Sequence, residues 1–165
     1  MNSFHKEKIH TLDSLVPVMK EEKKRGKKVV FTNGCFDLIH VGHTRYLQQA
    51  RNQGDLLVIA VNSDLSVKGL KGDKRPLIPI EERLEVLAGL YFVDYVLPFD
   101  EPDPYKTIAA LEPDVLAKGG DWPIEKIIGN DLVLARGGKV LSIPFVEGNS
   151  TTSIIDLICS RYCQP

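Results

Sequence analysis

Segments that read as buried strands alternate with segments of helical periodicity along most of this 165-residue chain. The expected strands are residues 28–32, 55–63, 95–99, 114–120 and 139–145. The expected helices are residues 43–54, 79–90, 103–111, 129–138 and 150–163. Strands and helices that alternate at this spacing are typical of a parallel sheet with helices on both faces. The sequence therefore predicts one α/β domain, residues 1–165, built on a parallel five-stranded sheet.

Residues 1–27 precede the first expected strand and are predicted to form a helical extension that packs on the domain. Apolar side chains recur there at helical spacing: Leu12, Leu15, Val16 and Met19. We expect Asp13 or Ser14 to cap this helix and Gly26 to end it. The basic run "KEEKKRGKK" is then its solvated C-terminal end rather than a nucleic-acid patch.

The composition excludes several classes of function. With 21 basic and 22 acidic residues, the chain has no overall field that would recruit nucleic acid or an anionic membrane. No apolar run approaches the ~18 residues that span a bilayer, and the N-terminus lacks a signal-peptide pattern. We therefore expect a cytoplasmic protein with no nucleic-acid or membrane partner. Three cysteines leave one unpaired, which disfavours a disulfide framework.

The loops that follow the expected strands are the candidate ligand sites. In parallel sheets of this kind, ligands bind beyond the carboxyl ends of the strands, where the strand order switches. Four loops qualify: residues 32–43, 62–79, 118–122 and 145–152.

The first loop passes from a strand into a helix through "HVGH", residues 40–43. Gly34 permits a tight turn after the strand, and Gly42 lets the backbone approach a ligand. A helix N-terminus offers free N–H groups and a partial positive charge, which favour an anion. His40 and His43 would add two donors that stabilise charge developing on phosphate oxygens.

An HxxH pair could instead ligate a metal, but a metal site needs a third and a fourth ligand. The soft candidates are Cys159 and Cys163, one helical turn apart. Their helix has an apolar face formed by Ile154, Ile155, Leu157 and Ile158. We therefore expect both cysteines to be small core or edge residues, and we predict no metal site.

The second loop carries four cations within eight positions: Lys68, Lys71, Lys74 and Arg75. Such a run is commonly a solvated loop. Here it follows a strand and so lies on the same rim as the histidines. Mobile cations at this rim could close over a polyphosphate and neutralise a leaving group.

The two remaining loops are less specific. Ser150, Thr151 or Thr152 could cap the last helix, and together they could form a second phosphate site. In the third loop, Gly119 and Gly120 permit close backbone approach, and "DW" at residues 121–122 could meet a sugar or a base.

Two motifs, taken together, resemble the cytidylyltransferase-like nucleotidyltransferases: "HVGH" at residues 40–43 and "STT" at residues 150–152, about one hundred residues apart. The resemblance runs from Lys28 onward and implies a Rossmann-like fold of the HxGH nucleotidyltransferase type. Within the family, the chain looks most like the heptose 1-phosphate adenylyltransferases, which make ADP-heptose for bacterial lipopolysaccharide. The stretches that carry this likeness are "FTNGCFDLIHVGHTRYL", "LKGDKRPLIPIEERLEVLAGLYFVDYV", "KGGDW" and "VEGNSTTSII".

Relatives that transfer cytidylate to glycerol phosphate carry two cations near the last motif. This chain has Phe145 and Ser153 at those positions, which weakens that alternative. Heptose enzymes usually have Tyr after Gly-Gly-Asp, where this chain keeps an aromatic side chain in Trp122.

The resemblance implies adenylyl transfer from ATP to a sugar 1-phosphate, with Mg²⁺ carried in by ATP. It implies catalytic roles for His40, His43 and Lys71. It implies nucleotide contacts at Asn33, Gly34, Cys35, Phe36, His40, Gly42, His43, Lys68, Arg75, Gly119, Asp121, Glu147, Gly148, Ser150, Thr151 and Thr152. It implies substrate contacts at Thr32, Asp37, Asp64 and Trp122.

Two alternatives remain at this point: a cytidylyltransferase for glycerol 3-phosphate, and a non-catalytic nucleotide-binding module. About 27 residues precede the first expected strand, far fewer than a typical domain of ~100–200. We therefore expect the heptose kinase and phosphatase that act upstream to be separate proteins. A homodimer is the default expectation for such a fold.

Overall fold

The computed structural model describes residues 5–144 and 150–163. Its centre is a five-stranded sheet of parallel strands in the order β3-β2-β1-β4-β5. The strands are β1 (Val29–Gly34), β2 (Leu56–Asn62), β3 (Tyr95–Phe99), β4 (Val115–Gly119) and β5 (Lys139–Ile143). The predicted parallel five-stranded sheet is confirmed.

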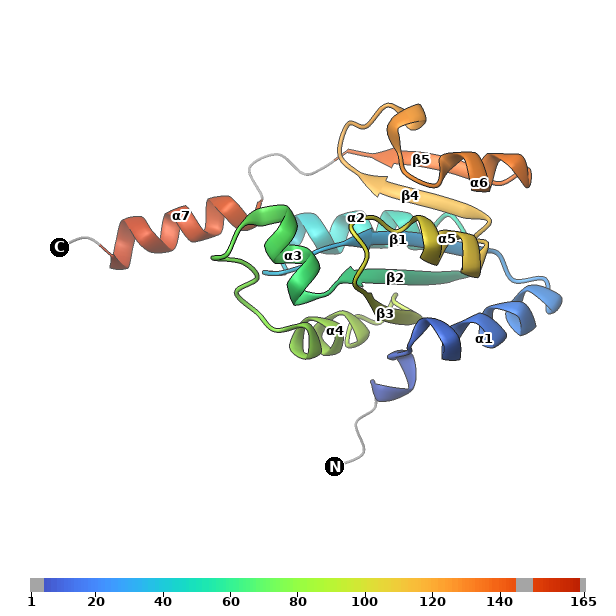
Figure 1. The fold of residues 1–165 in the computed structure, drawn as a ribbon, viewed down its shortest axis with the longest axis horizontal. Helices are drawn as coiled ribbons and strands as arrows, with labels where there is room; N and C mark the ends of the chain where they lie inside the picture. Colours follow the sequence, from blue (N-terminus) through green and yellow to red (C-terminus); the bar gives the residue numbers. More distant parts are fainter. Residues whose placement is uncertain (1–4, 145–149, 164–165) are drawn as a thin grey trace.

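Helices lie on both faces of the sheet (Figure 1). They are α1 (Leu12–Lys24), α2 (Val41–Arg51), α3 (Asp64–Lys71), α4 (Ile80–Ala88), α5 (Tyr105–Leu111), α6 (Asn130–Ala135) and α7 (Thr151–Tyr162), with short 3-10 turns η1 (Lys6–Lys8) and η2 (Ile124–Lys126). Apolar residues of α2 and α4 pack on one face, and those of α1, α5 and α6 pack on the other. The N-terminal helix α1 is part of this packing, since it buries Leu15 and Met19 completely or nearly so.

The strand order creates a switch point between β1 and β4. From β1 the chain moves to β2 and β3 on one side, and β4 and β5 lie on the other side. The connections that leave β1 and β4 therefore diverge, which opens a crevice at the carboxyl ends of these two strands.

Two local predictions need correction. Thr11, and not Asp13 or Ser14, is the N-cap of α1. Its hydroxyl accepts a hydrogen bond from the Ser14 N–H, and the Ser14 hydroxyl accepts one from the Thr11 N–H, which completes a capping box. Residues 62–79 are not a continuous loop, because they contain helix α3. Ser63 caps α3 and Val67 anchors it in the interior, so Gly69 on its exposed side is tolerated at a cost of ~1 kcal/mol.

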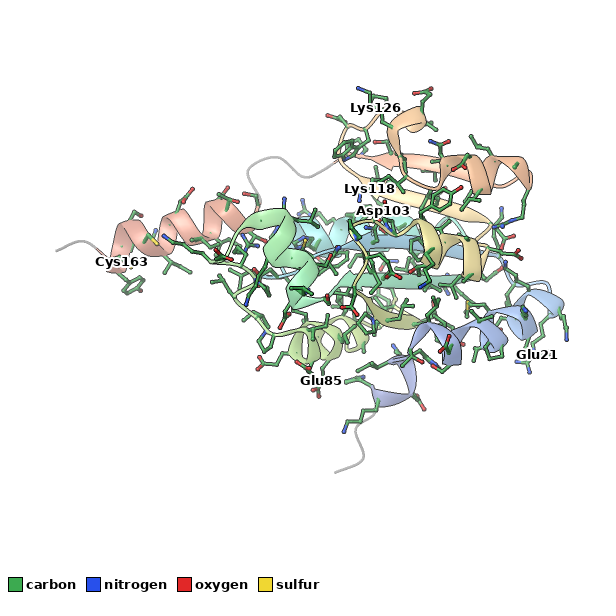
Figure 2. The ribbon with its side chains drawn as sticks, viewed as in Figure 1. Glu21, Glu85, Asp103, Lys118, Lys126 and Cys163 are labelled. Atoms are coloured by element: carbon green, nitrogen blue, oxygen red, sulfur yellow. The ribbon has the colours of Figure 1, made fainter. Side chains whose placement is uncertain are left out.

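Helix α7 also differs from expectation. It extends away from the sheet (Figure 1), and Leu157 and Ile158 are each about half exposed. Cys159 and Cys163 are exposed rather than core or edge residues; Cys163 lies at the far end of the helix (Figure 2). The helix is amphipathic, but most of it extends beyond the sheet. Its apolar periodicity therefore predicted more burial than the structure shows. No helix in the described ranges combines the length and apolar character needed to cross a bilayer.

Candidate active site

A cavity of about 420 Å³ lies at the carboxyl ends of β1 and β4. It combines the first loop with the end of α3, the end of β4 and the start of α7. The residues that line it are Asn33, Gly34, Cys35, Phe36, Asp37, His40, His43, Tyr46, Lys71, Arg75, Lys118, Gly119, Trp122, Ser150, Thr151 and Thr152. Its size is typical of small-molecule sites, which run from ~300 to 1,000 Å³.

His40 is the N-cap of α2. Its Nδ1 accepts a hydrogen bond of 3.2 Å from the Gly42 N–H. An acceptor Nδ1 requires the neutral ring to carry its proton on Nε2, so His40 keeps one N–H to donate to a ligand. The Gly42 N–H is already used, so it does not add to the anion site in this geometry.

His43 lies one turn into α2, with its ring centroid 3.9 Å from that of His40. Among the buried side-chain nitrogen and oxygen atoms of the described residues, His43 Nδ1 is the one with no hydrogen-bond partner. Burial, reinforced by the neighbouring His40, lowers the pKa of His43 from 6.5 to about 4. Burial also lowers the pKa of His40. Both rings are therefore neutral at pH 7, and they can donate hydrogen bonds without carrying a fixed charge.

The turn before α2 depends on Phe36 rather than on a left-handed glycine. Phe36 has a positive φ of 47°, an unusual conformation for a bulky residue. Its ring lies over Gly34, where an added Cβ would come within 3.0 Å of the ring. The same ring packs 5.4 Å from the His43 ring. Gly34 thus makes room for the aromatic wall of the histidine pocket, a different role from the tight turn that we expected.

Asp37 holds the segment before α4 against the first loop. Its fully buried carboxylate accepts hydrogen bonds of 2.9 Å from the N–H groups of Leu77 and Ile78, and it pairs with the Arg75 guanidinium. Burial favours the neutral acid, but these donors outweigh burial and hold the pKa of Asp37 below its usual value. Arg75 is thereby fixed at the wall of the cavity.

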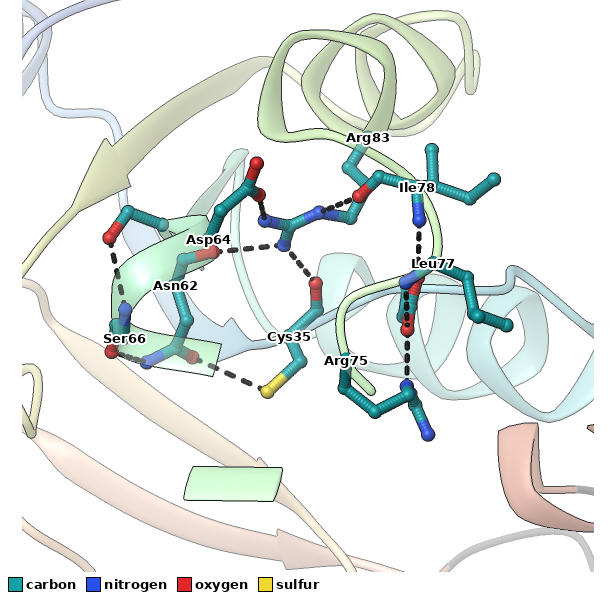
Figure 3. A network of polar contacts seen from close by, with 10 residues as sticks. Cys35, Asn62, Asp64, Ser66, Arg75, Leu77, Ile78 and Arg83 are labelled. Atoms are coloured by element: carbon teal, nitrogen blue, oxygen red, sulfur yellow. Dashed lines mark hydrogen bonds and ion pairs between the residues drawn. The ribbon is translucent and has the colours of Figure 1, made fainter. Parts of the chain in front are cut away.

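Arg83 of α4 is a buried hub that the sequence analysis missed (Figure 3). Its guanidinium donates to the carbonyls of Ile78 and Asn62, each at 2.9 Å, and to the carbonyl of Cys35. It also forms an ion pair of 2.7 Å with Asp64. Arg83 therefore ties the first loop to the end of β2, the start of α3 and the segment before α4. A signal was present, since Arg83 falls on the apolar face of its helix beside Leu84 and Leu87.

The cations of the second segment separate into two groups. Lys71, the last residue of α3, and Arg75 line the cavity, whereas Lys68 is exposed and does not line it. Burial raises the pKa of the Cys35 thiol, and the charges of Lys71, Arg83, Arg75 and Lys118 oppose this rise. Arg75 and Arg83 are already paired with Asp37 and Asp64. Lys71 and Lys118 line the cavity with Cys35 and are therefore the cations of this group that offer positive charge to a polyphosphate.

The start of α7 closes one side of the cavity. Ser150 caps the helix by accepting a hydrogen bond of 3.0 Å from the Ser153 N–H, as we expected for one hydroxyl of this group. Thr151 donates a bond of 3.4 Å to the Leu38 carbonyl, which ties α7 to the first loop. Thr152 is exposed at the rim.

Several expected contact residues lie outside the cavity wall. Thr32 is buried and shares a hydrogen bond with the Tyr46 hydroxyl, and the Asp64 carboxylate is engaged by Arg83. Gly42, Lys68 and Asp121 also do not line the cavity. Glu147 and Gly148 lie outside the described residues.

Two lining residues were not predicted as site residues. Tyr46 follows His43 by three positions on the same face of α2, and its hydroxyl donates to the Ala117 carbonyl at 3.1 Å. Lys118 lies inside an otherwise apolar strand, β4. A lysine within a buried strand was the available signal for that residue.

Possible metal ligands are sparse at this site. Within residues 5–144 and 150–163, no three His, Cys, Asp or Glu side chains are grouped as a metal site would require. The rings of His40 and His43 lie next to each other in the cavity, whereas the two cysteines lie on the exposed helix α7.

Comparison with protein families gives a match to the cytidylyltransferase-like family over residues 31–156. The chain is 56% identical to the bifunctional protein HldE of Citrifermentans bemidjiense over 155 residues, which cover 94% of this chain and 32% of that protein. It is 54% identical to the bifunctional protein HldE of Geobacter metallireducens with the same coverage. The chain thus spans about a third of the length of these relatives.

Two solved structures share the fold. A lipopolysaccharide core biosynthesis protein from Thermoplasma volcanium superposes with a TM-score of 0.58 at 28% identity, covering 75% of this chain and 100% of the other. A pantoate-beta-alanine ligase from Francisella tularensis superposes with a TM-score of 0.62 at 14% identity, covering 95% and 79% of the two chains. The second likeness is one of fold alone.

Proposed function

We propose that this chain, which belongs to the cytidylyltransferase-like family, is an adenylyltransferase that transfers AMP from ATP to a heptose 1-phosphate. The products are ADP-heptose and pyrophosphate. The observation that carries the proposal is the adjacent pair of neutral histidines at the start of α2, whose ring centroids lie 3.9 Å apart. Among the described residues, Nδ1 of His43 has no hydrogen-bond partner. This pair shares one cavity with Lys71 and the hydroxyls of residues 150–152.

The reaction requires no covalent bond between the protein and the substrates. An oxygen of the sugar phosphate attacks the α-phosphorus of ATP in line, and the bond from that phosphorus to the bridging oxygen of pyrophosphate breaks. Catalysis then rests on positioning and on stabilising charge as it develops. His40 and His43 donate N–H groups to the reacting phosphate, and Lys71 offsets the charge of the attacking or leaving phosphate.

The choice of heptose rests on likeness. The stretches "FTNGCFDLIHVGHTRYL" and "KGGDW" resemble heptose 1-phosphate adenylyltransferases, and a structural relative at 28% identity is named a lipopolysaccharide core biosynthesis protein. The relatives named HldE are called bifunctional, and the chain matches about a third of their length. We infer one of the two activities for this chain, namely the nucleotidyl transfer.

Three further statements belong to the proposal. Mg²⁺ enters with ATP, bound to phosphate oxygens and water, as it commonly is in nucleotide sites. The enzyme works where ATP is available, so we infer a cytoplasmic location. The homodimer stays a prediction.

A panel of nucleoside triphosphates against phosphorylated acceptors, read as pyrophosphate release, tests the function. We expect ATP with heptose 1-phosphate to be the fastest pair, and we expect His43→Ala to abolish most of that signal. Faster turnover of CTP with glycerol 3-phosphate would identify a cytidylyltransferase instead. Nucleotide binding with no pyrophosphate from any pair would identify a binding module.

A further inference from the structure

A second cavity of about 380 Å³ adjoins the first and reaches toward the opposite face of the sheet. Both cavities are lined by Asn33, Gly34, Cys35, Lys71, Lys118 and Trp122. The second cavity alone is lined by Asn62, Leu70, Pro102, Asp103, Pro104, Lys126, Ile127 and Ile128. Asp103, Lys118 and Lys126, which are labelled in Figure 2, come from three segments that line this cavity.

Three neighbouring strands place polar side chains at the floor of this second cavity. Side chains two residues apart on a strand lie on the same face of the sheet. The face that packs against α1, α5 and α6 therefore carries Asn33, Asn62 and Lys118, near the carboxyl ends of β1, β2 and β4. The histidines belong to α2, on the other face. Lys118 therefore lies where the two cavities meet.

Lys118 is a partly buried cation without a carboxylate partner in the described part of the chain. Its Nζ donates one hydrogen bond of 3.3 Å, to the side-chain oxygen of Asn33. An ammonium has three donors, so others are left for a ligand. Burial lowers the pKa of Lys118, and the nearby charge of Lys71 lowers it further. A partly buried cation near a second cation is unfavourable unless an anion joins them.

We propose that Lys118 binds the phosphate of the acceptor sugar, together with Lys71, and that the second cavity holds the sugar itself. This inference rests on the proposed transferase function. Trp122 offers an aromatic face to the sugar ring, and Asp103 and Asn33 offer acceptors for its hydroxyls. The expected substrate contacts Thr32, Asp37 and Asp64 do not line this cavity.

The position of Lys118 explains how two anions can react. A phosphate oxygen of the sugar forms the new bond to the α-phosphorus, and the electron pair of the broken bond leaves on pyrophosphate. The attacking phosphate is already deprotonated, so no base is needed. The negative charge of this phosphate is repelled by the triphosphate of ATP. Lys118 and Lys71 line both cavities, so their positive charges reduce this repulsion and lower the barrier.

Steady-state kinetics of Lys118→Met test the proposal, with Lys118→Gln as a second variant. We expect the KM for heptose 1-phosphate to rise roughly ten- to hundredfold, the usual range for a hydrogen bond to a charged group, while the KM for ATP changes little. Stability in urea should stay equal or rise, because an uncompensated buried charge is removed. A merely structural lysine would lower stability and leave the KM for the sugar phosphate unchanged. The matched control is Lys139→Met, an exposed lysine at the amino end of β5.

Calorimetry separates this proposal from the proposed function. Inorganic phosphate and heptose 1-phosphate are titrated into the wild type and into Lys118→Met. If the wild type binds both ligands more tightly than the variant does but makes no nucleotide sugar, the phosphate site stands and the transferase function fails. If the wild type is active and Lys118→Met raises the KM for ATP alone, or changes neither KM, the acceptor site is overturned.

Discussion

Two polar clusters lie side by side at the carboxyl edge of the sheet, and they differ in how completely their groups are paired. The paired cluster consists of Asp37, Asp64 and Arg83. Most of the polar atoms of these side chains form hydrogen bonds of 2.7–3.0 Å. In the open cluster, His43, Lys71 and Lys118 line a cavity with few partners in the described residues. Each cluster includes a more exposed side chain, Asp64 in the first and Lys71 in the second, so burial alone does not distinguish them.

The difference indicates what each cluster is for. Buried polar groups are normally satisfied, and a satisfied network specifies one arrangement of the loops that it joins. Groups left unsatisfied beside a cavity reduce stability and are retained where a ligand completes them. The paired cluster therefore builds the site, and the open cluster is the part that we propose binds the phosphates.

The largest effect is expected from Arg83→Met, which breaks the paired cluster. Three backbone carbonyls lose their donor, so unfolding free energy should fall by roughly 3–5 kcal/mol. Urea denaturation measures this loss. The control is Arg136→Met, which removes a 3.6 Å ion pair with Glu112 at the surface and should cost under about 1 kcal/mol. Equal losses in the two variants would show that the Arg83 network does not organise the fold.

His43→Ala should have the next largest effect, and on rate rather than on stability. Loss of one preorganised donor to the reacting phosphate raises the barrier by ~2.7–4 kcal/mol, which is roughly a 100- to 1,000-fold loss of turnover. Pyrophosphate release and urea denaturation are measured on the same preparation. His10→Ala, which contacts Ser14 and Glu7 at the N-terminal helix, serves as control. A near-normal rate for His43→Ala would make the histidine structural.

A smaller loss of turnover, roughly ten- to hundredfold, is expected for Lys71→Ala. Lys71 is exposed at the end of α3 and has little packing to lose, so its contribution is to charge. Lys74→Ala, a neighbouring exposed lysine that does not line the cavity, should keep its rate. If Lys71→Ala lowers the melting temperature and leaves the rate intact, Lys71 belongs with the paired cluster instead.

The last effect is expected in the pH dependence of stability. The pKa of His43 falls from 6.5 to about 4 on folding, so the stability that the neutral ring contributes is complete above pH 6.5 and is lost as pH falls toward 4. Unfolding free energy of the wild type should therefore drop more steeply across this window than that of His43→Ala. Asp37 has a lowered pKa and stays charged there, since its contribution is lost only below about 3.8. Parallel curves for the two proteins would contradict a neutral buried His43.

The sequence predicted those parts of the fold that depend on short-range periodicity. The strands β1 to β5 were found within two residues of their observed ends, because a buried strand between helices has a recognisable length and composition. The helix α3 was missed, since Gly69 and the dense cations concealed a short helix anchored mainly by Val67. The exposure of α7 was missed as well, because an apolar helix face in the sequence does not show whether another element packs against it.

For the site, the sequence alone determined the pairing of His40 and His43 at a helix start, since that geometry is local to residues 40–43. It also determined that the loops after parallel strands share one edge. Only the tertiary structure decided which strands are neighbours, and hence that Lys118 meets Asn33 across 85 residues. It likewise decided that Arg83 is a hub and that Asp64 is its partner. Local patterns report period and burial, whereas contacts between strands depend on the order in which the crossovers place them in the sheet.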